Sequence, residues 1–402
     1  MIPYASYFYF AIAGTLAAIP LVAMNLWQRS RWFWILAISA AMLVVQYGAI
    51  LPSPESKISE LGWIGIYAIA EGLVAFLFLQ SRRHSASRWI FSAAIAAAIA
   101  PLVASRIGGH LQHPLGFAGL SYAVFRMIDL LVGIQDRKIQ KFNPADFLAF
   151  LFFFPTVSSG PIDRFVRFQK DFRSVRTREM FRADLDDAVH PIFTGFLYKY
   201  VIAHYLYKFV LGNWMENAGP GRVVLYFYGC ALYLFFDFAG YSAFAVGVSR
   251  IFGIQTPINF NKPFLAKNIR EFWNRWHMSL SAWFRDHIYM RFLMAMMQTR
   301  PGWNPQILSA AGLLLSFGLM GLWHGTEWHY IAYGFYQAGL MIGYEQWSAL
   351  KKRRKWRHSS RWMDALSIGL TFHCVCLGFL IFAGGVPPLV AKTPKHQHSS
   401  SK

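Results

Sequence analysis

Long apolar blocks dominate this 402-residue sequence. A helix needs about 20 apolar residues to cross the hydrocarbon core of a bilayer, whereas barrel strands would alternate apolar and polar residues. Only 14% of the residues are charged, against roughly 25% in soluble domains. The sequence therefore predicts an all-α, multi-pass membrane protein, and it argues against a soluble enzyme, a disordered chain or a disulfide scaffold. The blocks lie at approximately 4–27, 32–51, 61–80, 89–105, 115–134, 190–212, 223–248, 307–323, 328–347 and 366–385.

The basic residues are distributed unevenly between the two sets of loops. One set holds 30 of the 39 Lys and Arg residues, the other set holds six, and three lie inside blocks. Basic loops stay in the cytoplasm, so we expect an outward amino terminus in the inner (plasma) membrane. The net charge of +20 is then an insertion signal and an attraction for anionic lipid, and we expect no nucleic-acid partner. The expected cytoplasmic loops are 28–31, 81–88, 135–145, 158–189, 249–306 and 351–361.

Segment 147–157 is apolar but too short to span a bilayer comfortably, and both of its flanks are basic. We expect Pro155 to end its helix and the segment to be re-entrant. Irregular backbone at membrane depth requires cover by protein or a water-filled cavity.

Segment 256–300 is rich in Trp, Arg and Asn, and no part of it is apolar enough to span. A helix starting at Asn268 would carry aromatic residues on one stripe and polar residues on the adjoining stripe. An interfacial anchor is one interpretation, and a helix lining a polar cavity is the other. The polar stripe would contain Arg270, Asn274, His277, Ser281 and Arg285.

Several ionisable residues fall inside or at the end of apolar blocks, where they are functional candidates. His324 ends a block between Trp323 and Gly325. Asp237 we interpret as a structural partner for a Lys or Arg. The three cysteines and His373 offer no closed four-ligand set, so we predict no metal site.

These motifs resemble those of a known family. Residues 268–291, with the core Phe-Trp-Asn-Arg-Trp-His-Met-Ser-Leu-Ser, and residues 321–325, Gly-Leu-Trp-His-Gly, resemble the signature of the membrane-bound O-acyltransferase (MBOAT) family. Residues 154–164 and 233–241 resemble its D-alanyl-transferring branch. The resemblance covers nearly the whole chain and is strongest at about 150–335.

The resemblance implies one domain over 1–390, with a ring of about 10–12 transmembrane helices and re-entrant segments around a central tunnel. We expect residues 391–402 to be a disordered tail. The implied activity moves a D-alanyl group from the phosphopantetheine thioester of a small acidic carrier protein to hydroxyls of a teichoic-acid-type cell-envelope polymer. A small membrane protein that relays the acyl group is an open alternative to direct transfer, and no bound cofactor is implied.

Transfer of an acyl group to an alcohol requires a base, for which histidine is suited, and a donor toward the oxyanion. The family motif assigns the base to His324. We expect His277 to be the second catalytic histidine, with Asn274, Ser281 and Trp323 contacting substrate. Acetylation of an exported polysaccharide such as alginate or peptidoglycan is the alternative activity, and a transporter is a further one. The basic runs 164–178 and 351–355 are either topology signals alone or docking surfaces for the acidic carrier.

Overall fold

The computed structural model describes residues 7–26, 31–47, 60–84, 87–108, 117–212, 220–356 and 360–385. Over these ranges the regular structure is helical and contains no strand, which confirms the all-α class. The ring, the tunnel and the single domain over 1–390 stay predictions, and the tail 391–402 lies outside the described residues. Five described helices are long and apolar enough to cross a membrane: α3 (Glu60–His84), α4 (Arg88–Gly108), α10 (Pro220–Ile251), α14 (Pro305–His324) and α16 (Arg361–Phe382).

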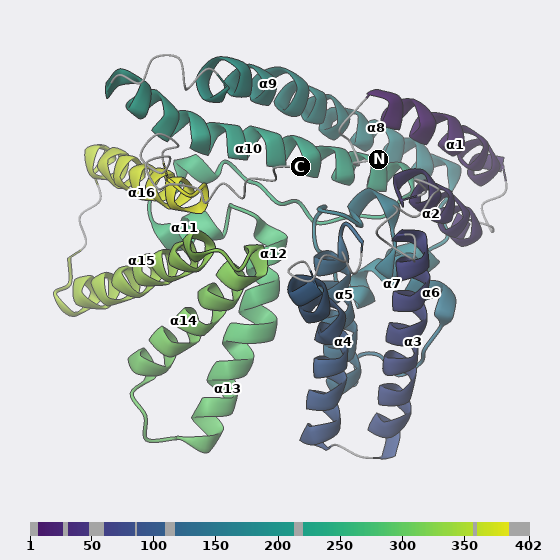
Figure 1. Cartoon of the computed structure of the whole chain (residues 1–402), viewed down its shortest axis with the longest axis horizontal. Helices are drawn as coiled ribbons and strands as arrows, with labels where there is room; N and C mark the ends of the chain where they lie inside the picture. The colour runs from purple at the N-terminus through teal and green to yellow at the C-terminus, as the bar shows by residue number, and fades with distance from the viewer. Residues whose placement is uncertain are drawn as a thin grey trace, which may run out of the picture. The chain divides into compact units, whose positions relative to one another are not determined.

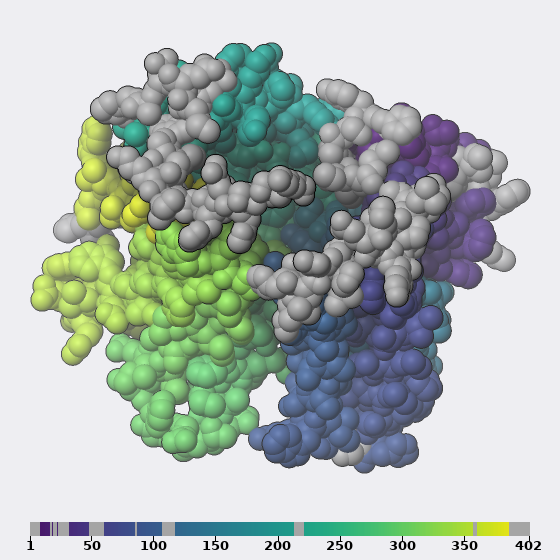
Figure 2. Space-filling model, in the orientation of Figure 1, coloured from purple at the N-terminus to yellow at the C-terminus, as the bar shows by residue number. Residues whose placement is uncertain are grey.

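The chain divides into two compact units (Figure 1). Unit 1 comprises residues 1–195 and 241–258, and unit 2 comprises residues 196–240 and 259–402, so helix α10 contributes to both. In unit 1, α3 packs along α4 (Figures 1 and 2), and both contact α5. The remaining helices of this unit are α1 (Tyr7–Leu26), α2 (Arg31–Tyr47), α5 (Leu120–Gln135), α6 (Pro144–Leu151), α7 (Phe165–Arg173) and α8 (Arg178–Phe196, which ends at the boundary).

The segment expected to be re-entrant is a broken helix inside unit 1. Helix α6 ends at Leu151, earlier than the expected stop at Pro155, which lies instead in a short 3-10 turn. Pro155 has no N–H to donate to the Leu151 carbonyl four residues earlier, so a helix cannot continue past Leu151. The buried guanidinium of Arg126, on α5, lies at this break. It donates hydrogen bonds to the carbonyl oxygens of Phe150, Leu151 and Thr156 at 2.9, 2.8 and 2.6 Å. Protein thus satisfies the carbonyls that this irregular backbone leaves outside a helical ladder, as buried backbone requires.

Unit 2 holds the motifs at residues 268–291 and 321–325, which lie on short helices and at the end of the long helix α14. In Figure 1, α14 runs beside α13 and α15. Gly321 and Gly334 permit the close contact of α14 with α15, because a Cβ on either would lie about 2.5 Å from a backbone oxygen of the other helix. The other helices of this unit are α9 (His204–Leu206), α11 (Ile269–Trp273), α12 (Met278–Phe284), α13 (Met290–Thr299) and α15 (Trp328–Arg353), with π-helices at Leu197–Ala203, Tyr207–Leu211 and Arg285–Tyr289.

Asp237 of α10 is paired as expected. Its Oδ1 lies 2.5 Å from Nζ of Lys199, which sits on the π-helix Leu197–Ala203. Both charges come from apolar blocks of the sequence, and burying either alone would carry a large desolvation cost. The expected pairing of Asp237 with a Lys or Arg is therefore confirmed.

Candidate active site around His277 and His324

The single helix expected from Asn268 onward is interrupted, and that expectation was wrong. Helix α11 begins after Asn268, whose side chain accepts a hydrogen bond from the Glu271 amide, and it ends at Trp273. His277 then adopts a left-handed conformation, with φ 42° and ψ 50°, immediately before α12 begins. The sequence predicted one continuous helix because its aromatic and polar residues keep the spacing of two helix faces on both sides of this break.

The break is held by a neighbouring loop at residues 259–261. The amide of Asn261 donates to the Arg275 carbonyl at 3.0 Å, and the amide of Met278 donates to the Asn259 carbonyl at 2.9 Å. The Asn259 side-chain oxygen also accepts from the hydroxyl of Ser279 at 2.6 Å. These bonds replace helical ones and so stabilise the unusual backbone at His277, a conformation that costs free energy for a residue other than glycine.

The break separates His277 from the polar stripe to which the sequence assigned it. His277 is only 4% exposed, and its ring packs edge-on against Phe238 with centroids 4.7 Å apart. Its Nδ1 has no hydrogen-bond partner among the described residues. Burial, and to a lesser extent positive charge on His324, lower the pKa of His277 from 6.5 to about 3. A pKa this low keeps the His277 imidazole neutral at physiological pH.

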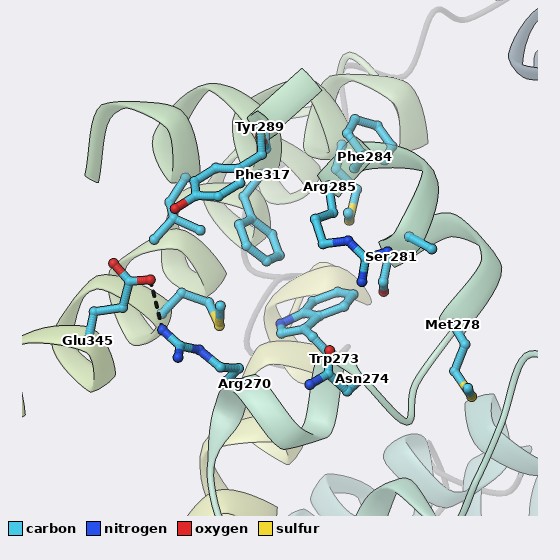
Figure 3. A pocket seen from close by; sticks show the side chains of 15 residues that line it. Arg270, Trp273, Asn274, Met278, Ser281, Phe284, Arg285, Tyr289, Phe317 and Glu345 are labelled. Carbon is cyan, nitrogen blue, oxygen red and sulfur yellow. Dashed lines mark hydrogen bonds and ion pairs between the residues drawn. The ribbon is translucent and has the colours of Figure 1, made fainter. Parts of the chain in front are cut away.

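A cavity of about 440 Å³ lies in unit 2 beside α11 and α12 (Figure 3). Asn274 and Ser281 line it, as their expected role in substrate contact requires, together with the aromatic faces of Trp273 and Phe317. Among the described residues that form its lining, His277, His324 and Trp323 do not appear. The lining does include Met278, which follows His277 in sequence, and Met320, one turn before His324 on α14.

One wall of this cavity carries a partly exposed ion pair. Arg270 donates to Oε1 of Glu345 at 2.9 Å (Figure 3). The other carboxylate oxygen of Glu345 accepts from the hydroxyl of Ser309 at 2.7 Å, and that hydroxyl also lies 2.8 Å from the Tyr289 hydroxyl. This series of hydrogen bonds from Arg270 to Tyr289 gives the cavity one fixed polar side.

His324 closes α14 inside a group of aromatic rings. Its ring centroid lies 4.5 Å from Trp323 and 4.9 Å from Phe382, which meets it edge-on at 85°. Tyr330 and Tyr333 also face it, at 6.2 and 6.5 Å. Such a surrounding orients an imidazole and limits the access of water to it. The structure thus places Trp323 beside the histidine that it precedes in sequence.

Gly325 permits this arrangement. A Cβ at this position would lie 2.4 Å from a ring atom of Tyr330, so the chain turns from α14 to α15 directly over that ring. The amide of Gly325 bonds the Gly321 carbonyl. A glycine after the histidine is therefore a packing requirement of the motif.

The two basic runs differ in structure. In unit 1, four arginines of the run 164–178 are paired with carboxylates. The positive charge of this run is therefore largely neutralised by other residues of unit 1. The pairs are Arg164 with Asp129, Arg167 with Asp163 and Asp171, Arg173 with Asp146, and Arg176 with Asp184.

The run 351–355 at the end of α15 behaves differently. Its five cationic side chains make no ion pair with any described residue. Lys351 and Arg354 instead lie over the rings of Trp347 and Trp356, at 5.3 and 5.4 Å. This surface, unlike the run 164–178, keeps its positive charge available to a partner.

Comparison with known proteins agrees with these motifs. The profile of the membrane-bound O-acyltransferase family matches residues 130–382, which include both histidines. The chain belongs to the membrane-bound O-acyltransferase family. It is an acyltransferase, and membrane-bound O-acyltransferases are multi-pass membrane proteins, in agreement with the apolar helices.

Individual relatives show which membrane-bound O-acyltransferases the chain is similar to. The chain is 40% identical to the teichoic acid D-alanyltransferase of Bacillus subtilis, over 96% of this chain and 98% of that protein. It is 35% identical to the same enzyme of Streptococcus thermophilus, over 95% of each. The protein named "Probable alginate O-acetylase AlgI" of Pseudomonas fluorescens is 29% identical, over 80% of this chain but only 60% of its own length.

Sequence reasoning missed two residues of this architecture. Arg126 could have been found as an arginine inside an apolar block, since such residues need a buried partner. Asn259 carries no comparable signal, because its contact with Ser279 joins segments that are distant in the chain.

Proposed function

We propose that this acyltransferase moves a D-alanyl group from the phosphopantetheine thioester of a small acidic carrier protein to hydroxyls of a teichoic-acid-type polymer outside the cell. The observation that carries the proposal is the placement of the motif histidine His324 among aromatic rings at the end of α14, in a chain similar over 96% of its length to a teichoic acid D-alanyltransferase. We place the protein in the plasma membrane, where donor and acceptor would lie on opposite faces.

The two histidines would divide the chemistry. His324, held in its aromatic surrounding, would take the proton of the acceptor hydroxyl while that oxygen attacks the thioester carbonyl. The carbon–sulfur bond then breaks, and the proton passes from His324 to the departing thiolate. His277 is neutral because burial lowers its pKa to about 3, so its ring N–H can donate to the oxyanion without titrating.

The 440 Å³ cavity would hold the phosphopantetheine arm of the acyl donor. Its walls include Met320 and Met341 as well as Trp273, and its polar side is the Arg270–Glu345 pair. A phosphopantetheine arm is a flexible chain of amide and methylene groups, which an apolar channel with a few polar contacts suits. Asn274 and Ser281 are the residues on this lining that we expect to contact it.

The acidic carrier would meet the run 351–355 rather than the run 164–178. Uncompensated charge attracts an acidic partner and mainly raises its rate of association. The proposal leaves open whether the acyl group then passes directly to the polymer or through a small membrane protein.

The test compares transfer by purified wild-type protein with two histidine variants. His324→Ala should lower the D-alanyl transfer rate by ~10²–10⁴, the usual contribution of a general base, while donor affinity stays unchanged. His277→Ala should lower the rate and also weaken donor binding, because its backbone shapes the start of α12. His204→Ala, at an exposed position on α9, is the matched control and should behave as wild type.

Substrate class is tested in the same preparation. D-alanyl carrier and an acetyl donor are supplied in parallel, and we expect transfer from the first only. Transfer from the acetyl donor alone would instead favour O-acetylation of an exported polysaccharide, the activity suggested by the more distant relatives. A His324→Ala protein with wild-type turnover would refute both.

A further inference from the structure

His329 joins the beginning of α15 to the end of α16. Its Nδ1 lies 2.8 Å from the carbonyl oxygen of Phe382, and its Nε2 lies 2.6 Å from a carboxylate oxygen of Glu327. Because a carbonyl can only accept, Nδ1 carries the hydrogen and donates it. Phe382 is the last residue of α16, and the final carbonyls of a helix lack partners within it. His329 therefore anchors a helix end that would otherwise be free to fray.

The residue that His329 anchors is also a neighbour of His324. The Phe382 ring meets the His324 ring edge-on at 4.9 Å, and it packs against Tyr330 and Tyr333 at 5.1 and 5.3 Å. A phenylalanine ring is separated from its own carbonyl by few rotatable bonds. Fixing the carbonyl of Phe382 therefore restricts where its ring can lie against His324.

We propose that His329 is a positioning residue for acyl transfer, which acts by holding Phe382 against His324. This inference rests on the proposed role of His324 as the base. Glu327 orients the His329 ring through Nε2, so the connection runs from Glu327 through His329 and Phe382 to His324.

The effect should appear in the chemical step. A displacement of about 1 Å caused by a residue away from the chemistry can lower a rate by ~10². The donor cavity is lined by residues of α11, α12, α14 and α15 that His329 does not contact. We therefore expect loss of His329 to lower kcat and to leave the KM for the donor unchanged.

Two substitutions at one position separate this role from general packing. His329→Leu removes the donor to the Phe382 carbonyl and should lower kcat by ~10–100-fold. His329→Asn places a side-chain N–H close to the position of Nδ1, and it should restore kcat to within a few-fold of wild type. A merely structural role would make the polar asparagine no better than leucine at this half-buried position.

A second histidine of α16 supplies the matched control. His373 also has Nδ1 close to a backbone carbonyl, that of Gly369 at 2.6 Å, and Nε2 close to the Tyr228 hydroxyl at 2.9 Å. It contacts none of the rings around His324 in the described part of unit 2. His373→Leu should retain wild-type kcat.

An independent measurement does not require turnover. Diethyl pyrocarbonate modifies accessible imidazoles, and mass spectrometry reports the rate at His324 separately. His329→Leu should raise that rate several-fold, whereas His329→Asn and His373→Leu should match wild type. If wild-type protein transferred no D-alanine, the proposed substrate would be wrong, yet this measurement would still test the contact.

The proposal is overturned by any of three results. These are a His329→Leu protein with wild-type kcat and His324 reactivity, an asparagine variant no better than leucine in either measurement, and a loss confined to the KM for the donor.

Discussion

Asn259 and Ser279 are joined by two hydrogen bonds that end on one oxygen. The side-chain oxygen of Asn259 accepts from the Ser279 hydroxyl at 2.6 Å and from its amide at 3.3 Å. Both residues are buried, and the contact lies two residues after the left-handed backbone of His277. The position of the second histidine thus depends on a loop 18 residues earlier in the chain.

This contact predicts a measurable coupling between the two residues. Asn259→Ala should lower stability by about 1–3 kcal/mol, because it removes the buried oxygen that accepts from both the hydroxyl and the amide of Ser279. The double variant with Ser279→Ala should lose less than the sum of the single losses, by about 1 kcal/mol. Unfolding in detergent measures the stability of the wild type, both single variants and the double variant. Strict additivity of the losses would contradict the coupling.

The low pKa of His277 predicts a pH dependence of stability. The folded protein holds this imidazole neutral down to about pH 3, whereas in the unfolded chain it takes up a proton below about pH 6.5. Protons therefore favour the unfolded state, and stability should fall as pH decreases through 6.5. At pH 5 the contribution lost is about 2 kcal/mol. His277→Gln should show a flatter slope between pH 7.5 and 5, and equal slopes would contradict the prediction.

The two basic runs should respond differently to charge reversal. Arg167 is paired with the buried Asp163 and also with Asp171, so Arg167→Glu should destabilise the protein by about 2–4 kcal/mol, since it leaves a buried carboxylate unpaired. Lys352 is exposed, and Lys352→Glu should leave stability unchanged while it weakens association with the acidic carrier. The carrier titration should be repeated at low and high salt, because an exposed charge is screened at ~0.15 M. A carrier that binds both variants as tightly as wild type would make the run 351–355 a topology signal only.

Lysine should not be able to replace Arg126. Lysine keeps the charge but lacks the planar fork that reaches the carbonyls of Phe150 and Leu151, at the end of α6, and of Thr156, beyond it. Arg126→Lys should therefore cost about 1–3 kcal/mol, the penalty of buried acceptors left unsatisfied. Arg83→Lys, at an exposed position of α3, is the comparison and should unfold at the wild-type temperature. Equal unfolding temperatures for the two variants would show that water or other donors replace the guanidinium.

Membrane orientation follows from the distribution of basic residues. Single cysteines replacing Lys57 and Arg354 in a cysteine-free background should react differently with an impermeant maleimide in intact cells. We expect labelling at position 57 and protection at position 354. Labelling at 354 alone would reverse the orientation and with it the proposed face for the carrier.

The sequence by itself determined the all-helical membrane class and the family. Apolar blocks of spanning length can satisfy their backbone inside a bilayer only as helices or closed barrels, and the solid apolar pattern excludes barrels. The motifs around His277 and His324 could be recognised because they are local and rich in rare residues. The pairing of Asp237 was also predictable, since an intramembrane carboxylate requires a counter-ion.

Tertiary structure decided how the site is built. The break at His277 depends on hydrogen bonds from 259–261, and the surrounding of His324 depends on Phe382, 58 residues away in sequence. Amphipathic periodicity measures only the fit of one segment to a helix, so it predicted an unbroken helix where a distant loop supplies better partners for the backbone. The neutralisation of the run 164–178 has the same cause, because its carboxylates come partly from Asp129 and Asp146 on other helices. Local pattern fixes which groups are present, and only the packing of distant segments fixes which of them meet.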